Sequence, residues 1–377
     1  DLGYMGNPRP LSPNLDRLAA QSVVFERAYS LASYTGKSMG PLLIGKYASE
    51  LDGGFLHFNR YTKSEVFLQE RLQAAGVRTV SVQGYWYFFQ NSGFERGFHV
   101  IDSSAAPKVA AIEGDQSSNS DEQSDAAIRQ LGAPELLQNR FFMWLHYVDP
   151  HAEYARHAEH DFGNKPRERY DGEVAFVDHH VGRFLEALSK TPFGARTALI
   201  VTSDHGEAFG EHGMIRHGFE LWEELVRVPL ILKVPGVPPR RVTARRSGID
   251  LVPTVLDLFK VEHDPKGPRD FLSGESLLPD FVSQLPAASE AIEGASPAQR
   301  PVFMDMARGP HNAERQALID EDLKLTVSDG RVLGLYDLAS DPEEKRDLAK
   351  DPAQLEPIRR KYSAFKSRLR RAPTPQP

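Results

Sequence analysis

The 377-residue sequence contains no cysteine, so disulfides, zinc–thiolate sites and cysteine nucleophiles are excluded. It also has no apolar run long enough to cross a bilayer. No long block of Lys and Arg is present, and the formal net charge is −7. The last two features argue against nucleic acid as the main partner. Lack of cysteine fits both cytosolic and exported proteins, so it does not identify a compartment.

The first residue is Asp1 rather than Met, and no signal-like segment follows it. We interpret the chain as a piece of a longer protein. The absence of a targeting signal within it therefore carries no information about the location of the whole protein.

Strand-like and helix-like segments alternate along most of the chain, which predicts an α/β fold. We expect a mostly parallel central sheet with helices on both faces and a small C-terminal antiparallel subdomain. Helices are predicted over 12–20, 35–45, 62–76, 171–190, 250–259 and 351–371, and strands over 23–25, 78–82, 140–145, 197–201 and 228–235. Residues 316–336 alternate like strands around an Asp329-Gly330 turn.

Two stretches are predicted to lie outside regular structure. Residues 103–124 are poor in apolar side chains and indicate a mobile surface loop. Residues 283–300 are rich in Ala, Ser, Pro and Glu, which is typical of a linker or excursion. We therefore expect a catalytic domain over 1–282, a linker over 283–300 and a C-terminal subdomain over 301–377.

The most informative stretch runs from Thr197 to Gly213. An apolar strand, Ala198-Leu-Ile-Val201, gives way to Asp204, His205 and further polar residues. Active sites of α/β proteins form at such strand ends. Carboxylate and imidazole together suit a divalent metal with mixed oxygen and nitrogen ligands. The alternative is that Asp204 caps a helix and His205 is solvated.

A second candidate is Thr35, which directly precedes a predicted helix. Gly36-Lys37-Ser38 invites comparison with a phosphate-binding loop, but the glycine which that motif requires five residues earlier is Leu31. A hydroxyl before a helix whose first N–H groups point at an anion is the better interpretation. Thr35 as a simple helix cap remains the alternative.

A third strand end carries His146-Tyr-Val-Asp-Pro-His151, with two histidines around an Asp-Pro turn. The aromatic run Tyr85-Trp-Tyr-Phe-Phe89 also follows a strand. Aromatic side chains at that position either pack in the core or line a pocket.

These stretches, with two more, resemble the sulfatase family of the alkaline-phosphatase superfamily. The matching segments are Ser12-Pro-Asn-Leu-Asp-Arg-Leu18, the nucleophile segment from Thr35 to Gly45, His146 to His151, Thr202-Ser-Asp-His-Gly-Glu207, and Leu335-Tyr-Asp-Leu-Ala-Ser-Asp-Pro-Glu-Glu344. The match extends from about residue 3 to about residue 349, and the last two segments are the most specific. The resemblance implies a metal-dependent ester hydrolase.

The resemblance also implies roles for individual residues. Asp204 and His205 would be metal ligands, and Thr35 would be both the nucleophile and a ligand of the same metal. His151 would contact the sulfuryl or phosphoryl group. His217 would contact the leaving oxygen, and Lys37 would offset charge on the transferred group.

The sequence departs from the family at several of these positions. Family sulfatases oxidise a Cys or Ser nucleophile to formylglycine, and Thr35 is neither. The Pro, Ser and Arg that follow in the family are Lys37, Ser38 and Met39 here, so the supporting arginine is lost. The first metal-binding Asp of the family would fall before residue 1.

Three functions stay open at this point. The first is hydrolysis of sulfate or phosphate esters. The second is a phosphoethanolamine- or phosphoglycerol-type transferase, because those superfamily members use a threonine nucleophile. The third is a catalytically inactive member that binds anions.

The ligand types indicate Mn, Zn or Ca as the divalent metal ion without choosing among them. The expected partner is a small-molecule, glycan or lipid ester, and no nucleic acid. By analogy with related bacterial proteins, we expect an extracytoplasmic location and a membrane anchor upstream of this segment.

Overall fold

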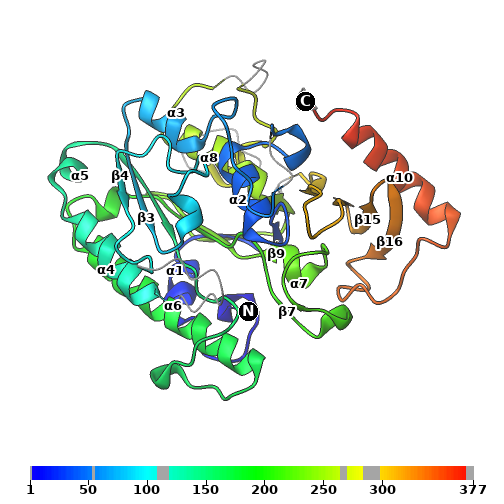
Figure 1. Cartoon of the computed structure of the whole chain (residues 1–377), viewed down its shortest axis with the longest axis horizontal. Coiled ribbons are helices and arrows are strands. Elements are labelled where there is room, and N and C mark those ends of the chain that lie inside the picture. The colour runs from blue at the N-terminus through cyan, green and yellow to red at the C-terminus, as the bar shows by residue number, and fades with distance from the viewer. Residues whose placement is uncertain (1, 53–55, 108–118, 264–269, 283–297, 371–377) are drawn as a thin grey trace. The chain divides into compact units, whose positions relative to one another are not determined.

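The computed structural model describes residues 2–52, 56–107, 119–263, 270–282 and 298–370 (Figure 1). The chain divides into two compact units, and each unit is discontinuous in sequence. The first comprises Asp1–Val24, Gln69–Ile200 and Ile231–Arg240. The second comprises Phe25–Leu68, Val201–Leu230 and Arg241–Pro377.

The first unit is built on a parallel sheet with strand order β4-β3-β5. Val80 of β3 lies opposite Val100 of β4 on one side and Met143 of β5 on the other. Parallel neighbours need crossover connections, which the helices of this unit supply. Its elements are α1 (Pro13–Ala19), α3 (Leu68–Ala74), β3 (Arg78–Gln83), β4 (Val100–Asp102), α4 (Ser120–Leu131), α5 (Pro134–Gln138), β5 (Phe141–His146) and α6 (Pro166–Ser189). The chain passes between the units in or beside β1 (Val23–Phe25), β6 (Leu199–Thr202), β10 (Leu230–Lys233) and β11 (Arg240–Val242).

Helices α4 and α6 cover this sheet (Figure 1). The apolar spacing of α6 places Phe184 and Leu188 in a core with Val80 and Val82 of β3. Asp178, also on α6, accepts hydrogen bonds from the backbone N–H groups of Asn14 and Leu15. A carboxylate from a distant helix therefore satisfies free N–H groups at the N-terminus of α1.

The second unit contains three sheets, with orders β12-β2-β9, β7-β8 and β13-β14-β15-β16. Its elements are β2 (Ala28–Tyr29), α2 (Thr35–Ile44), β7 (Ala208–Phe209), β8 (Ile215–Arg216), α7 (Glu223–Val226), β9 (Arg227–Val228), β12 (Arg246–Ser247), α8 (Leu251–Leu258), α9 (Pro279–Val282), β13 (Val302–Met306), β14 (Arg315–Asp320), β15 (Leu323–Ser328), β16 (Arg331–Asp337) and α10 (Pro352–Lys366). A shared core joins Tyr29 of β2, Leu225 of α7, and Met304 and Ile319 of the four-stranded sheet.

The four-stranded sheet is the small antiparallel C-terminal sheet that the sequence predicted, and with the parallel sheet it confirms the predicted α/β class. Asp329 and Gly330 both have positive φ, at 47° and 77°, as a two-residue hairpin turn between β15 and β16 requires. The predicted subdomain boundary stays a prediction, because residues 283–297 of the expected linker lie outside the described residues.

Two predicted elements differ from the structure. The helix expected over 62–76 is restricted to Leu68–Ala74. Glu65 is buried, where it accepts hydrogen bonds from the Lys46 ammonium and the Asp52 N–H, and these tertiary contacts hold it outside the helix. The loop expected over 103–124 ends early, because α4 begins at Ser120. Residues 108–118 of that loop lie outside the described residues.

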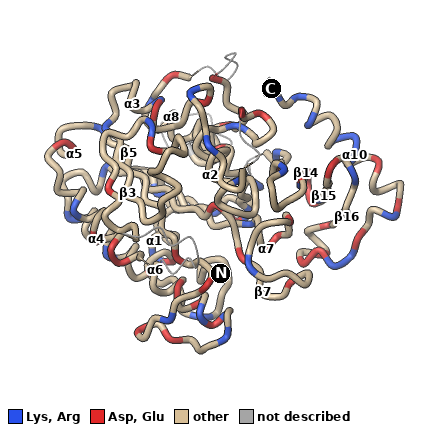
Figure 2. The backbone as a smooth tube through the Cα atoms, viewed as in Figure 1, with Lys and Arg blue, Asp and Glu red and all other residues tan. Residues whose placement is uncertain are grey.

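Charged side chains of both signs are interspersed along the described chain (Figure 2). In that part of the chain, no helix combines the length and apolar character that a membrane span requires.

Candidate active site

The polar stretch after β6 is held against α7 in the second unit. The Thr202 hydroxyl donates to the Pro229 carbonyl at 2.9 Å, and the Gly206 N–H donates to the Leu225 carbonyl at 2.8 Å. A Cβ at Gly206 would lie 2.1 Å from the Glu224 carbonyl oxygen, so this close approach requires glycine. The contacts fix the backbone on both sides of Asp204 and His205.

Thr35 is the first residue of α2 and lies beside that stretch. Its Oγ1 is 3.3 Å from His205 Nε2, and the Ser38 hydroxyl one turn later donates to the Asp204 carbonyl at 2.6 Å. The structure therefore brings the predicted nucleophile together with the two predicted metal ligands. The hydroxyl of Thr35 bonds a side chain across the site, which differs from the helix-capping alternative.

The tautomer of His205 follows from its contacts. Nδ1 is 2.9 Å from the Gly206 carbonyl, which can only accept, so Nδ1 carries the proton and Nε2 presents a lone pair. Burial lowers the pKa of His205, which favours this neutral form. Asp204 Oδ2 is 3.7 Å from the same Nε2. A carboxylate oxygen, an imidazole lone pair and the Thr35 hydroxyl thus converge, and this donor set fits a divalent cation.

His217 lies next to His205, with 4.3 Å between the ring centroids. Its Nδ1 is 3.1 Å from Glu207 Oε1, and the Glu207 side chain is only 5% exposed. Arg216, Gly218 and Phe219 around His217 all have left-handed φ, and the Gly218 N–H donates to the Ser33 carbonyl. The strained loop and the carboxylate together orient the imidazole.

Lys37 belongs to α2, and its side chain is buried in the protein. Its Nζ donates to the Leu56 carbonyl at 2.8 Å and to Asn59 Oδ1 at 3.1 Å. The side chain is buried, and burial lowers its pKa to about 8. Lys37 therefore ties the segment 56–59 to the helix that carries Thr35.

His57 is a residue of this neighbourhood that the sequence interpretation missed. Its ring stacks on Tyr34, which directly precedes Thr35, with centroids 5.1 Å apart. The ring of His311 also approaches that of His57, with 5.8 Å between the two ring centroids. Neither histidine follows an apolar strand or belongs to a recognised motif, so no sequence signal marks them.

His151 belongs to the first unit and is positioned by α6. Glu173 of α6 accepts the N–H groups of His151 and Ala155, which shapes the turn after β5. The His151 Nδ1 donates to the Ala152 carbonyl at 2.7 Å, so Nε2 is its acceptor nitrogen.

The aromatic run after β3 packs in the core of the same unit. Tyr87 and Phe88 are each 1% exposed. Phe88 contacts the rings of Trp144 and His146 at the end of β5, with centroids 5.0 and 4.4 Å apart. For these two aromatics and for His146, packing is the role that the structure supports.

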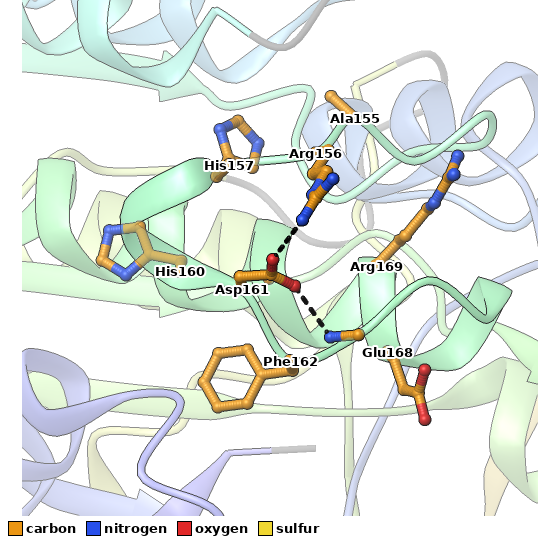
Figure 3. A pocket seen from close by; sticks show the side chains of 10 residues that line it. Ala155, Arg156, His157, His160, Asp161, Phe162, Glu168 and Arg169 are labelled. Atoms are coloured by element: carbon orange, nitrogen blue, oxygen red, sulfur yellow. Dashed lines mark hydrogen bonds and ion pairs between the residues drawn. The ribbon is translucent and has the colours of Figure 1, made fainter.

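A small surface hollow, shown in Figure 3, lies between the 155–163 segment and the start of α6. In its lining, Asp161 Oδ2 accepts a hydrogen bond from Arg156 Nη2 at 2.5 Å, and Asp161 Oδ1 accepts one from the Gly163 N–H at 3.0 Å. No residue predicted to act in catalysis lines this hollow.

Among the described residues, one group of three histidine and acidic side chains has ligand atoms close enough to hold a metal ion. It consists of His212, Glu224 and Glu344. It is a different set from the predicted ligands Asp204, His205 and Thr35.

Comparison with known proteins identifies the relatives of this chain. A family model described as Sulfatase matches residues 1–261. The uncharacterized sulfatase YidJ of Escherichia coli (strain K12) is 23% identical over 423 residues, which covers 92% of this chain and 80% of that protein. Arylsulfatase K of Gallus gallus is 29% identical over 54% of this chain, but the matched region is only 38% of the chicken protein.

Solved structures agree with the predicted fold. The phosphonate monoester hydrolase SpPMH from Silicibacter pomeroyi superposes with a TM-score of 0.74 at 20% sequence identity. The superposition covers 95% of this chain and 90% of that one. The alkaline-phosphatase-like fold predicted from the sequence is thereby confirmed.

Proposed function

Because this chain belongs to the sulfatase family, whose members hydrolyse sulfuric esters, we propose that it hydrolyses sulfate or phosphate esters with Thr35 as nucleophile. The observation that carries this proposal is the 3.3 Å approach of Thr35 Oγ1 to His205 Nε2. This contact sets a partly buried hydroxyl beside an imidazole whose side chain is 11% exposed. Sulfatases form a metal-dependent family, and the proposed ligands are Asp204, His205 and Thr35.

In this proposal, Asp204 and His205 would hold a divalent cation, whose Lewis acidity would let the Thr35 hydroxyl release its proton to solvent. Thr35 Oγ1, as the alkoxide, attacks the sulfur or phosphorus atom opposite the leaving oxygen. Its place at the start of α2 holds it still, because Ser38 anchors the same helix to the Asp204 backbone. Water then cleaves the threonine ester.

His217 is the proposed proton donor to the leaving oxygen. Glu207 binds its Nδ1, so Nε2 is the nitrogen that can face a substrate. Glu207 is therefore a positioning residue for this proton transfer.

Two further residues complete the proposal. For His151, contact with the transferred group is what the family resemblance implies, and it stays a prediction. Lys37 is proposed to offset negative charge there, and its bonds to Leu56 and Asn59 give it a second role in ordering the segment that carries His57.

Because Thr35 and Met39 depart from the family pattern, two alternative functions are also proposed. Thr35 cannot follow the formylglycine route, and a threonine nucleophile favours transfer of a phosphoethanolamine or phosphoglycerol group to an alcohol. A third function, anion binding without turnover, follows if the arginine replaced by Met39 is essential. The proposed substrate is a small-molecule, glycan or lipid ester, and the proposed location is extracytoplasmic.

The deciding assay uses the protein loaded with Mn²⁺ or Zn²⁺ and offers an aryl sulfate and an aryl phosphate separately. We expect turnover of at least one ester at a rate that added alcohol leaves unchanged. Acceleration by alcohol, with the alcohol found in the product, would assign a transferase. Absence of turnover in a metal-loaded protein that sulfate or phosphate still stabilises would assign the binding-only function.

Glu207→Gln is expected to lower kcat by roughly 10- to 100-fold with little change in KM, because a neutral amide holds the Nδ1–H of His217 less strongly than a carboxylate does. The loss should be larger for an alkyl ester than for a nitrophenyl ester, since a good leaving group needs less protonation. Glu211→Gln, an exposed carboxylate on the same segment, is the control. Equal losses for both esters would contradict a role in leaving-group protonation.

A further inference from the structure

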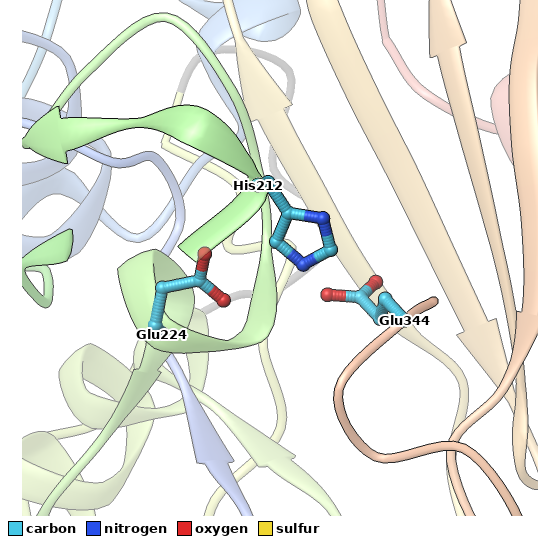
Figure 4. Close-up of side chains that lie close together, drawn as sticks. All are labelled: His212, Glu224 and Glu344. Carbon is cyan, nitrogen blue, oxygen red and sulfur yellow. The ribbon is translucent and has the colours of Figure 1, made fainter. Parts of the chain in front are cut away.

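His212, Glu224 and Glu344 come from three separate segments of the second unit and meet at one point (Figure 4). His212 follows β7, Glu224 lies in α7, and Glu344 lies in the loop after β16. One ligand atom from each lies within 4.8 Å of the other two. Figure 4 shows the imidazole between the two carboxylates, with one ring nitrogen on their side.

The imidazole of His212 is held in place before any ligand binds. Its face stacks on Trp222, with ring centroids 3.9 Å apart and planes only 5° from parallel. The residue has a φ of 51°, a left-handed conformation that costs a non-glycine residue roughly 1 kcal/mol. Such strain is kept where the surrounding structure needs the side chain in one direction.

Glu344 is buried and Glu224 is partly buried. Glu344 is 2% exposed. Glu224 Oε1 is buried and, among the described residues, has no hydrogen-bond partner. A buried carboxylate oxygen without a donor is costly, so the position indicates a missing positive partner.

The local charges lead to the same conclusion. Lys324 Nζ lies 3.0 Å from carboxylate oxygens of both Glu223 and Glu344. One lysine thus pairs with two carboxylates. Glu224, which lies close to Glu344, adds a third negative charge. A cation next to Glu224 would offset this excess.

We propose that His212, Glu224 and Glu344 form a second divalent-cation site, separate from the Thr35 centre and selective for a zinc-type ion. Imidazole nitrogen and carboxylate oxygen are both ligand types that Zn²⁺ accepts, and water would be the fourth ligand. The ion would fasten the β7-β8 hairpin and α7 to the loop after β16. Because His217 directly follows β8, the same ion would order the segment that carries it. The site does not depend on the proposed hydrolysis.

The test measures zinc bound per chain in the full-length chain after stripping with a chelator, reloading with ZnCl₂ and gel filtration. We expect His212→Asn and Glu224→Gln each to bind one zinc fewer than wild type, with affinity at this site lowered more than about 100-fold. Asparagine tolerates the left-handed backbone of residue 212, so His212→Asn should fold. The rise in Tm that zinc gives the wild type should also shrink in both variants.

Two further variants make the result specific. Glu343→Gln, an exposed neighbour of Glu344 that pairs with Lys345, should bind as much zinc as wild type. Asp204→Asn should keep the zinc at this site, because it changes only the Thr35 centre. Wild-type stoichiometry in both His212→Asn and Glu224→Gln would overturn the site, and a loss in only one of them would overturn the three-ligand set.

Discussion

Replacing Thr35 with valine is expected to abolish turnover, with a loss in kcat of roughly 10³- to 10⁶-fold. Valine keeps the shape of threonine but removes the only atom proposed to bond to sulfur or phosphorus. Among the described residues, the side-chain contact recorded for this hydroxyl is the one with His205 Nε2. The measurement is single-turnover and steady-state hydrolysis of the preferred aryl ester by wild type and variant at equal metal loading.

Thr35→Ser is the matched control, because it restores a hydroxyl at the same place. We expect it to regain a measurable part of the rate, while the Tm of both variants stays close to that of wild type. A Thr35→Val protein that turns over at the wild-type rate would remove Thr35 as the nucleophile. The chemistry would then have to be assigned to another group near His205.

Replacing Lys324 with methionine is expected to destabilise the second unit by about 3–5 kcal/mol, because it leaves buried carboxylates uncompensated. Lys324 is completely buried, and its ammonium lies 3.0 Å from Glu223 and 3.0 Å from Glu344. Burial alone would lower the pKa of Lys324, but these two carboxylates raise it well above its ordinary value. The lysine is therefore charged, and urea unfolding should show a much lower midpoint in the variant.

The double variant Lys324→Met/Glu344→Gln should recover part of this loss, because only Glu223 then remains without its cation. Lys345→Met changes an exposed lysine next to Glu344 and should leave the unfolding midpoint unchanged. Two results would contradict this role of Lys324, Glu223 and Glu344 in holding β15 to α7. One is a Lys324→Met protein with the unfolding midpoint of wild type, and the other is a double variant with a lower midpoint than Lys324→Met.

Several parts of the candidate site could be predicted because their signal is local. The apolar run before Asp204 marks a strand whose end carries polar residues, and the structure has β6 ending at Thr202. Thr35 precedes a helix in the sequence and begins α2 in the structure. In both places the residues that determine the backbone are the ones next to the functional side chain, so a short window contains the information.

Other parts had no local signal. His57 stacks on Tyr34, next to Thr35 in the chain, in a segment that Lys37 binds at Leu56 and Asn59. Strand β13 was missed because its side chains are buried on both faces and do not alternate. The helix predicted from residue 62 begins at Leu68, since Glu65 is engaged by Lys46.

By itself, the sequence determined the α/β class, the order of the main strands and helices, and the motifs that relate Asp204 and His205 to a metal-dependent family. Those properties depend on periodicity and on neighbours along the chain. Tertiary structure alone decided that Glu207 orients His217, that Asp178 completes the N-terminus of α1, and that Glu224 and Glu344 meet at His212. Glu207 and His217 lie next to the paired residues of the β7-β8 hairpin, in the same register. The residues of the other two contacts are far apart in the chain. Their approach is set by how whole elements pack, and no short stretch of sequence records that packing.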